Sequence, residues 1–145
     1  HCLRLSTLDE LASVLASSSI EICPKKLRPK MPFFTLNTNV PESKVTEDFV
    51  LSTSKLVASL LSKPEGYVAI RINAGQKHMS FGGSTDPCGL AVLASIGGVG
   101  GSKNAGHSAK LSAHIEKALG IPSGRMYIQF INLAGSDTGF NGGTF

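Results

Sequence analysis

The chain reads PFFTLNTNVPESKVTEDFVLSTSKLVASLLSKPEGYVAIRIN from residue 32 to residue 73. Residues 32–39 are rich in aromatic and β-branched side chains and end in turn formers, which is typical of a strand. Residues 42–63 carry apolar side chains at helical spacing and end before a Pro-Glu-Gly turn. Residues 67–73 have the composition of a second strand. The apolar positions of the helical pattern are Val45, Phe49, Leu56, Val57, Leu60 and Leu61. The stretch therefore predicts one βαβ unit, with the right-handed crossover that such units adopt.

The same pattern occurs a second time later in the chain. Residues 90–98, LAVLASIGG, read as a strand that runs into a glycine-rich break. A helix is expected over residues 102–120 and a closing strand, MYIQFIN, over residues 126–132. The inward positions of this second helix are expected to be Leu111, Ile115, Ala118 and Leu119. Two βαβ repeats predict an α/β fold, in which a four-stranded sheet carries two helices on one face.

In this arrangement, no helix covers the second face of the sheet. The strands are almost continuously hydrophobic, as is typical of strands that are buried on both faces. An apolar face of several hundred Å² is unusual on a soluble monomer. We therefore expect a homo-oligomer in which the sheets lie inside and the helices outside.

The composition limits the possible classes of function. The chain has 145 residues, of which 41% are hydrophobic and 17% charged, and a net charge of +4. This suits one globular domain, and no run is apolar and long enough to span a bilayer. The basic residues cluster only in residues 25–30, which argues against nucleic-acid binding. Three cysteines, with Cys88 alone in the body of the chain, argue against a disulfide framework and favour a reducing compartment.

The first thirty residues differ from the rest. They lack the pattern of a signal peptide, because acidic residues interrupt any apolar run and the basic cluster comes last. We expect residues 1–30 to be a leader outside the domain of residues 31–145, either disordered or absent from the mature protein. A regulatory leader that masks the domain until it is cleaved is the alternative.

Several short motifs, spread over residues 31–145, occur together and in order. They are Pro32-Phe33-Phe34, Asn37-Thr38-Asn39-Val40-Pro41, Lys63-Pro64, Phe81-Gly82-Gly83-Ser84, Asp86-Pro87-Cys88, Ser95-Ile96-Gly97, Arg125-Met126-Tyr127-Ile128 and the ending Gly139-Phe140-Asn141-Gly142-Gly143-Thr144-Phe145. With these motifs the chain resembles the macrophage migration inhibitory factor and D-dopachrome tautomerase family, within the tautomerase superfamily. The resemblance covers the domain and stops at Met31.

This resemblance implies an assembly and an activity. It implies a homotrimer whose three sheets line a central barrel, with active sites between neighbouring subunits. It implies a cofactor-free isomerase that interconverts keto and enol forms of phenylpyruvate-like and dopachrome-like compounds. It also implies a cytokine that binds a cell-surface receptor and is found both in the cytoplasm and, without a signal peptide, outside the cell. A secreted receptor ligand with a catalytically silent pocket is the alternative, above all if residues 1–30 are retained.

The resemblance assigns the catalytic base to Pro32 after removal of Met31. An N-terminal proline is a secondary amine, and an apolar pocket next to a cation disfavours its charged form and lowers its pKa. A base with a pKa near the working pH is the most effective. An internal proline has an amide nitrogen without an available lone pair, so the chain with its leader attached is expected to be inactive.

The remaining site residues are also implied by the resemblance. Lys63 is expected to bind a substrate carboxylate, Ile96 to donate its backbone N–H to the substrate, and Tyr127 to reach the site from a neighbouring subunit. The apolar walls are expected to come from Phe33, Tyr67, Phe140 and Phe145. Two positions depart from the family pattern and put the substrate preference in question. Gln129 stands where the vertebrate factor has asparagine, and Thr138 takes the place of an apolar wall residue.

The histidines do not predict a metal site. His107 and His114 are seven residues apart on the second helix, but no carboxylate or thiolate joins them at ligand spacing. We expect both to lie on the surface, and His78 to lie in a loop.

Overall fold

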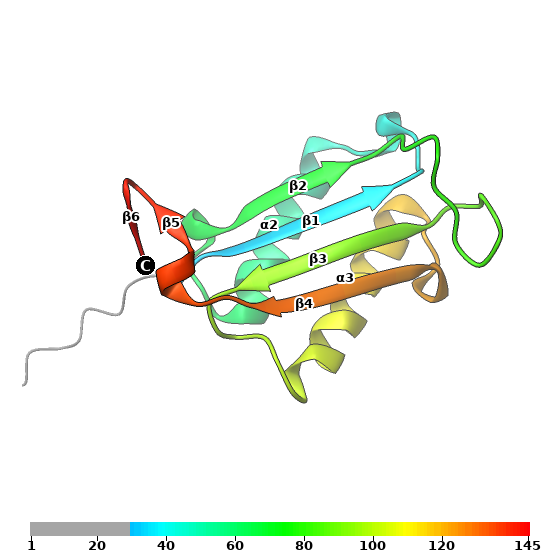
Figure 1. The fold of residues 1–145 in the computed structure, drawn as a ribbon. Helices are drawn as coiled ribbons and strands as arrows, with labels where there is room; N and C mark the ends of the chain where they lie inside the picture. Colours follow the sequence, from blue (N-terminus) through cyan, green and yellow to red (C-terminus); the bar gives the residue numbers. More distant parts are fainter. Residues whose placement is uncertain (1–29) are drawn as a thin grey trace, which may run out of the picture.

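The computed structural model describes residues 30–145, so the expectations for the leader lie outside the described residues, Lys30 excepted. Figure 1 shows a four-stranded sheet with two helices behind it and a small hairpin at one end. The strands of the sheet are β1 (Pro32–Thr38), β2 (Ala69–Asn73), β3 (Gly89–Ser95) and β4 (Met126–Asn132), and the helices are α2 (Glu47–Leu61) and α3 (Lys103–Leu119). The hairpin consists of β5 (Gly139–Phe140) and β6 (Gly143–Thr144).

The sheet confirms the two βαβ repeats. Its strand order is β2-β1-β3-β4. Strand β1 pairs in parallel with β2, and β3 pairs in parallel with β4. The two halves meet where β1 and β3 pair antiparallel, with Pro32 opposite Ser95. Each half is therefore a strand–helix–strand unit, as the repeated sequence pattern predicts.

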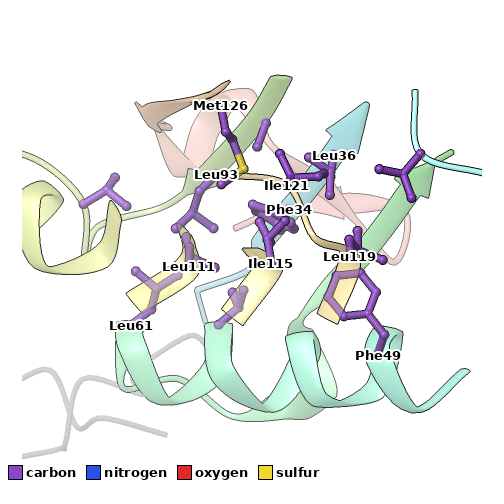
Figure 2. Close-up of a cluster of buried hydrophobic side chains, with 14 residues drawn as sticks. Phe34, Leu36, Phe49, Leu61, Leu93, Leu111, Ile115, Leu119, Ile121 and Met126 are labelled. Carbon is purple, nitrogen blue, oxygen red and sulfur yellow. The ribbon is translucent and has the colours of Figure 1, made fainter. Parts of the chain in front are cut away.

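Both helices cover the same face of the sheet, and the core lies between them and the strands (Figure 2). The alternate residues of β1 that face the helices, such as Phe34 and Leu36, are completely buried. The labelled side chains of this core are Phe34, Leu36, Phe49, Leu61, Leu93, Leu111, Ile115, Leu119, Ile121 and Met126. The prediction for Ala118 was wrong, since this residue is exposed. Leu119, about 100° further round the helix, takes the inward position of the last turn.

The first helix begins later than the sequence pattern predicts. The predicted segment of residues 42–63 forms a short 3₁₀ turn, Glu42–Lys44, and then α2 from Glu47. Thr46 separates the two as the N-cap, where its Oγ1 accepts a hydrogen bond from the backbone N–H of Phe49 at 3.2 Å. The cap satisfies a backbone donor that lacks a partner within the helix, so it fixes the start of α2 at this residue.

The face of the sheet away from the helices is more polar than we expected. Its residues form three rows across the strands: Ala69, Phe33, Ala94 and Ile131; Arg71, Thr35, Val92 and Gln129; and Asn73, Asn37, Leu90 and Tyr127. The middle row is polar except for Val92, and the other apolar members are spread over the outer two rows. Leu90 and Tyr127 are exposed large side chains of this face.

Within residues 30–145, neither helix is long and apolar enough to cross a membrane.

Candidate active site

Three of the predicted site residues meet at one end of the sheet. Pro32 is the first residue of β1, and the register places it opposite Ser95, the last residue of β3. Ile96 follows directly, and Lys63 follows the C-terminus of α2. The hairpin of β5 and β6 lies at the same end (Figure 1). The topology therefore joins segments that are far apart in the sequence.

The end of α2 places Lys63 at this edge. Ser62 adopts the left-handed conformation, with φ of 51°, and turns the chain out of the helix. The backbone N–H of Lys63 donates to the carbonyl of Ala58 at 2.9 Å, which satisfies one of the last helical carbonyls. The side chain consequently leaves the helix at the sheet edge, beside the end of β3.

The Lys63 ammonium group binds the chain just after β3. Its Nζ donates to the Ser95 hydroxyl, to the Ile96 carbonyl at 2.7 Å and to the Gly97 carbonyl at 3.1 Å. Burial lowers the pKa of Lys63, and the nearby positive charge of Lys30 lowers it further. The site thus holds a half-buried cation that is fixed by three oxygen atoms.

The turn of residues 96–98 is held by side chains from several elements. The Gly97 N–H donates to Oδ1 of Asn132, at the end of β4, at 2.9 Å. The Ser95 hydroxyl donates to the Gly97 carbonyl at 2.7 Å. The carbonyl of Gly98 accepts a hydrogen bond from Nε2 of His107, on α3, at 2.9 Å. These contacts fix the turn beside Pro32.

Pro32 is buried, and its nitrogen is joined to Met31 in a peptide bond. The carbonyl of Met31 accepts a long hydrogen bond of 3.4 Å from the backbone N–H of Ile96. In the chain with its leader, Met31 therefore occupies both the proline nitrogen and the backbone donor that the family resemblance assigns to the substrate.

Aromatic side chains cover this end of the sheet. The ring of Phe140 lies 5.8 Å from that of Tyr67 and 5.2 Å from that of Phe145, measured between centroids. The buried Thr138 donates its hydroxyl to the carbonyl of Ala134 at 3.0 Å, so this polar residue is satisfied within the chain. Tyr67, Phe140 and Phe145 form one wall, whereas Phe33 lies on the uncovered sheet face, in the same row as Ala94.

Tyr127 and Gln129 are not part of this group in the single chain. Tyr127 pairs with Leu90 at the start of β4, and its side chain is 68% exposed. It lies five positions before Asn132 at the site end of β4, which corresponds to about 17 Å along a strand. Gln129 is exposed in the middle row of the uncovered face. A second copy of the chain would have to supply both side chains to a site at Pro32.

Arg125 organises the loop beside Tyr127, a role that the sequence did not indicate. Its guanidinium donates to the carbonyls of Pro87, Ser84 and Asp86 at 3.1–3.2 Å. It also lies over the ring of Phe81, which packs against Tyr127 with 4.8 Å between ring centroids. Arg125 stands directly before a strand, in the motif Arg125-Met126-Tyr127-Ile128. Nothing else in the sequence indicates that it contacts the 81–87 loop.

The histidines have structural roles that the sequence did not indicate. The surface prediction was wrong for His107, which is buried because its ring packs near Phe130 and its Nε2 bonds to Gly98. His114 is partly buried against α2. His78 lies in an exposed loop, as predicted. Across residues 30–145, no three potential ligands of the types His, Cys, Asp and Glu lie close enough to hold a metal ion.

Comparisons with known proteins identify the family of this chain. Residues 31–145 match the family model described as macrophage migration inhibitory factor (MIF). Macrophage migration inhibitory factor homologs of Trichuris trichiura and Trichinella spiralis are each 56% identical over 115 residues, which is 79% of this chain and 100% of each relative. The solved structure of the Trichinella spiralis factor has a TM-score of 0.76 at 55% identity and covers 78% of this chain and 99% of that one. The homologue from Prochlorococcus marinus has a TM-score of 0.72 at 34% identity, over 78% and 98% of the two chains.

Proposed function

Because the chain belongs to the macrophage migration inhibitory factor family, we propose that its domain is a keto–enol tautomerase with Pro32 as general base. The observation that carries this proposal is the meeting of Pro32, Lys63 and Ile96 at one end of the sheet. The substrates would be enolisable carbonyl compounds with a carboxylate, of the phenylpyruvate type, and no cofactor would be needed.

The reaction requires a base that is unprotonated near neutral pH. Once Met31 is removed, Pro32 carries a secondary amine in a buried position near the Lys63 cation. Burial and a neighbouring positive charge both disfavour the protonated amine, so they lower its pKa. The amine would take a proton from the carbon next to the carbonyl while that C–H electron pair becomes a C=C bond. The carbonyl oxygen takes up a proton, so keto and enol forms interconvert without a net change in composition.

The substrate would be oriented by the other two groups. Lys63 would bind the carboxylate through its positive charge, and its ammonium group would exchange one of its three hydrogen bonds within the chain for one to the carboxylate. The N–H of Ile96 would donate to the substrate after the Met31 carbonyl has left. Removal of Met31 would therefore release the base and a binding group in one step.

The site would be completed by a second copy of the chain in a homotrimer. Tyr127 is exposed at the far end of the sheet face that no helix covers, which leaves it available to a neighbour. Its hydroxyl would lie over the neighbour's substrate, and Gln129 would supply an amide there. Because glutamine is longer than asparagine, we expect the substrate preference to differ from that of the vertebrate factor.

The test compares two forms of the protein in a phenylpyruvate tautomerisation assay. Protein expressed from Met31 should lose this methionine, begin at Pro32 and be active. The full 145-residue chain should be inactive, because its proline nitrogen is an amide. Pro32→Gly in the shorter form should reduce kcat/KM by at least about a hundredfold, the usual contribution of a general base. N-terminal sequencing identifies the active form, and full activity of a chain that retains its leader would refute the proposal.

We also propose a second role as a receptor ligand, which needs no free amine at Pro32 and would therefore remain open to the leader-bearing chain. In this form the protein would act outside the cell through the surface of its trimer. Pro32→Gly in protein expressed from Met31 separates the two roles, because it should abolish tautomerisation while it leaves signalling to responsive cells unchanged.

A further inference from the structure

His107 lies on α3, a helix that supplies none of the residues assigned to the proposed active site, and is 8% exposed. Its side chain nevertheless contacts the turn beside that site. Its Nε2 is 2.9 Å from the carbonyl oxygen of Gly98. A carbonyl can only accept, so this nitrogen carries the hydrogen and donates it. The ring centroid of Phe130 lies 6.3 Å away, which places the imidazole between the helix and the sheet.

The bond of His107 completes the anchoring of the 96–98 turn. The Ile96 carbonyl is held by Lys63, and the Gly97 carbonyl by Lys63 and Ser95. The Gly98 carbonyl comes next, and His107 holds it. All three carbonyls of the turn therefore have side-chain donors, and the Ile96 N–H remains on the side of Pro32 and Met31.

The turn has little freedom to find another arrangement. Gly98 has φ of +82°, a conformation that favours glycine. A Cβ added there would lie 3.2 Å from the Cδ2 atom of Leu61, at the end of α2. Gly98 is thus packed against α2 on one side and bonded to α3 on the other. Loss of the α3 contact would leave the carbonyl of the half-buried Gly98 without its donor and would favour a shift of the turn.

We propose that His107 is a positioning residue, which keeps the Ile96 N–H and the carbonyls that orient Lys63 in place for the substrate. The inference rests on the proposed tautomerase function. His107 does not touch the substrate and acts through the 96–98 turn. Since Pro32 belongs to β1, the base should keep its place when the turn shifts, so the effect should fall on substrate binding.

The kinetic test uses protein expressed from Met31, which spans the length of the homologous factors. His107→Leu removes the donor, and His107→Gln keeps an amide N–H at similar reach. We expect His107→Leu to raise KM for phenylpyruvate about tenfold, which corresponds to about 1.4 kcal/mol, while kcat changes about twofold or less. His107→Gln should restore KM to within about twofold of the wild type. His114→Gln is the matched control, because His114 lies on the same helix and contacts α2, and it should leave KM unchanged.

A purely structural role predicts a different result. It would lower the unfolding midpoint and the fraction of active protein, so that kcat falls while KM stays the same. That result, or an equal rise of KM in His114→Gln, overturns the inference. His107→Asn, whose amide is too short to reach Gly98, replaces His107→Leu if the latter does not fold. If neither folds, the bond is structural and the inference is overturned.

A measurement that needs no catalysis separates this inference from the proposed function. An inactive wild-type protein would refute the proposed function. In that case the backbone amide resonances of Ile96 and Gly97 are compared in the full-length wild type, His107→Leu and His107→Gln. Shifts in the leucine variant that the glutamine variant reverses support the positioning role. Unchanged resonances in the leucine variant overturn it.

Discussion

Ser62 is a single residue on which the place of Lys63 depends. It is one of two non-glycine residues with positive φ among residues 30–145, and it lies at the C-cap of α2. A side chain in this left-handed conformation costs about 1–2 kcal/mol. The cost is tolerated here because the chain must leave the helix at this point for Lys63 to reach the end of β3.

Replacement of Ser62 by glycine should stabilise the protein. Glycine adopts the left-handed conformation without the steric cost, but it also gains entropy in the unfolded chain, so a net gain of about 0.5 kcal/mol is expected. Urea denaturation measures the free energy of unfolding. Ser59→Gly, at an exposed position in the last turn of α2, is the control and should destabilise by about 0.5–1 kcal/mol. A loss of stability in both variants would contradict this account of the C-cap.

The charge of Lys30 should be visible in the titration of Lys63. Burial and then Lys30 lower the pKa of Lys63. Lys30→Gln in the full-length chain removes a positive neighbour, so the charged form of Lys63 is less disfavoured and its pKa should rise. An NMR titration of the Lys63 side chain measures this shift. Lys55→Gln, an exposed change on α2, should leave the titration unaltered, and no rise in Lys30→Gln would show that Lys30 does not act on the site.

At the scale of elements, the packing of α2 against α3 includes a histidine. The ring of His114 stacks on Phe49, with 5.3 Å between centroids and 17° between planes. Its Nε2 lies 3.0 Å from Oγ1 of Thr53, whose own hydrogen goes to the Phe49 carbonyl at 2.7 Å. The histidine nitrogen is therefore the donor, and the neutral ring is bonded to the facing helix.

This contact predicts that stability depends on pH. Burial, and then the positive charge of Lys117, lower the pKa of His114 from its ordinary value of 6.5. The unfolded chain therefore binds a proton more readily than the folded one, so the contribution of His114 is present above about pH 6.5 and is lost as the pH falls through the lowered folded value. Urea denaturation at pH 7.5 and pH 5.5 should show a smaller loss of stability in His114→Gln than in the wild type. An equal loss in both proteins would exclude His114 as its source.

At the level of the assembly, the proposed site would be divided between copies of the chain. Pro32 and Lys63 lie at one end of the sheet, and Tyr127 lies at the other. The uncovered face carries the exposed side chains of Leu90 and Tyr127, which a neighbouring copy would cover. The assembly would then be part of the catalytic machinery as well as a source of stability.

Mixed assemblies test this division. Pro32→Gly and Tyr127→Ala should each have low activity alone. When the two variants are unfolded together and refolded, about a quarter of the sites should combine an intact Pro32 from one copy with an intact Tyr127 from another, and activity should return. The matched control mixes Pro32→Gly with Lys63→Ala. Because one copy supplies both Pro32 and Lys63 to a site, every site in this mixture lacks one of them, and no activity should return. Absence of recovery in the first mixture would show that Tyr127 does not act across an interface.

Much of the fold could be predicted from the sequence, because the spacing of apolar residues within a segment indicates whether that segment is a strand or a helix. Strand β4 has the predicted bounds, and the other three strands of the sheet and both helices differ from the prediction by a few residues at their ends. The hairpin of β5 and β6 was not predicted. The start of α2 was missed, although Thr46 followed by Glu47 and Asp48 is a sequence pattern typical of an N-cap. Pro32, Lys63 and Ile96 entered as candidates through the family resemblance, and nothing in their spacing shows that they meet.

The two βαβ repeats follow from the amino-acid sequence alone, because the periodicity of apolar residues indicates which side of each strand and helix avoids water. The contacts between polar groups depend on the folded chain: His107 with Gly98, Arg125 with the 81–87 loop, and Met31 with Ile96. Hydrogen bonds are short and directional, so a contact between residues distant in the chain exists only after packing has set the elements in place.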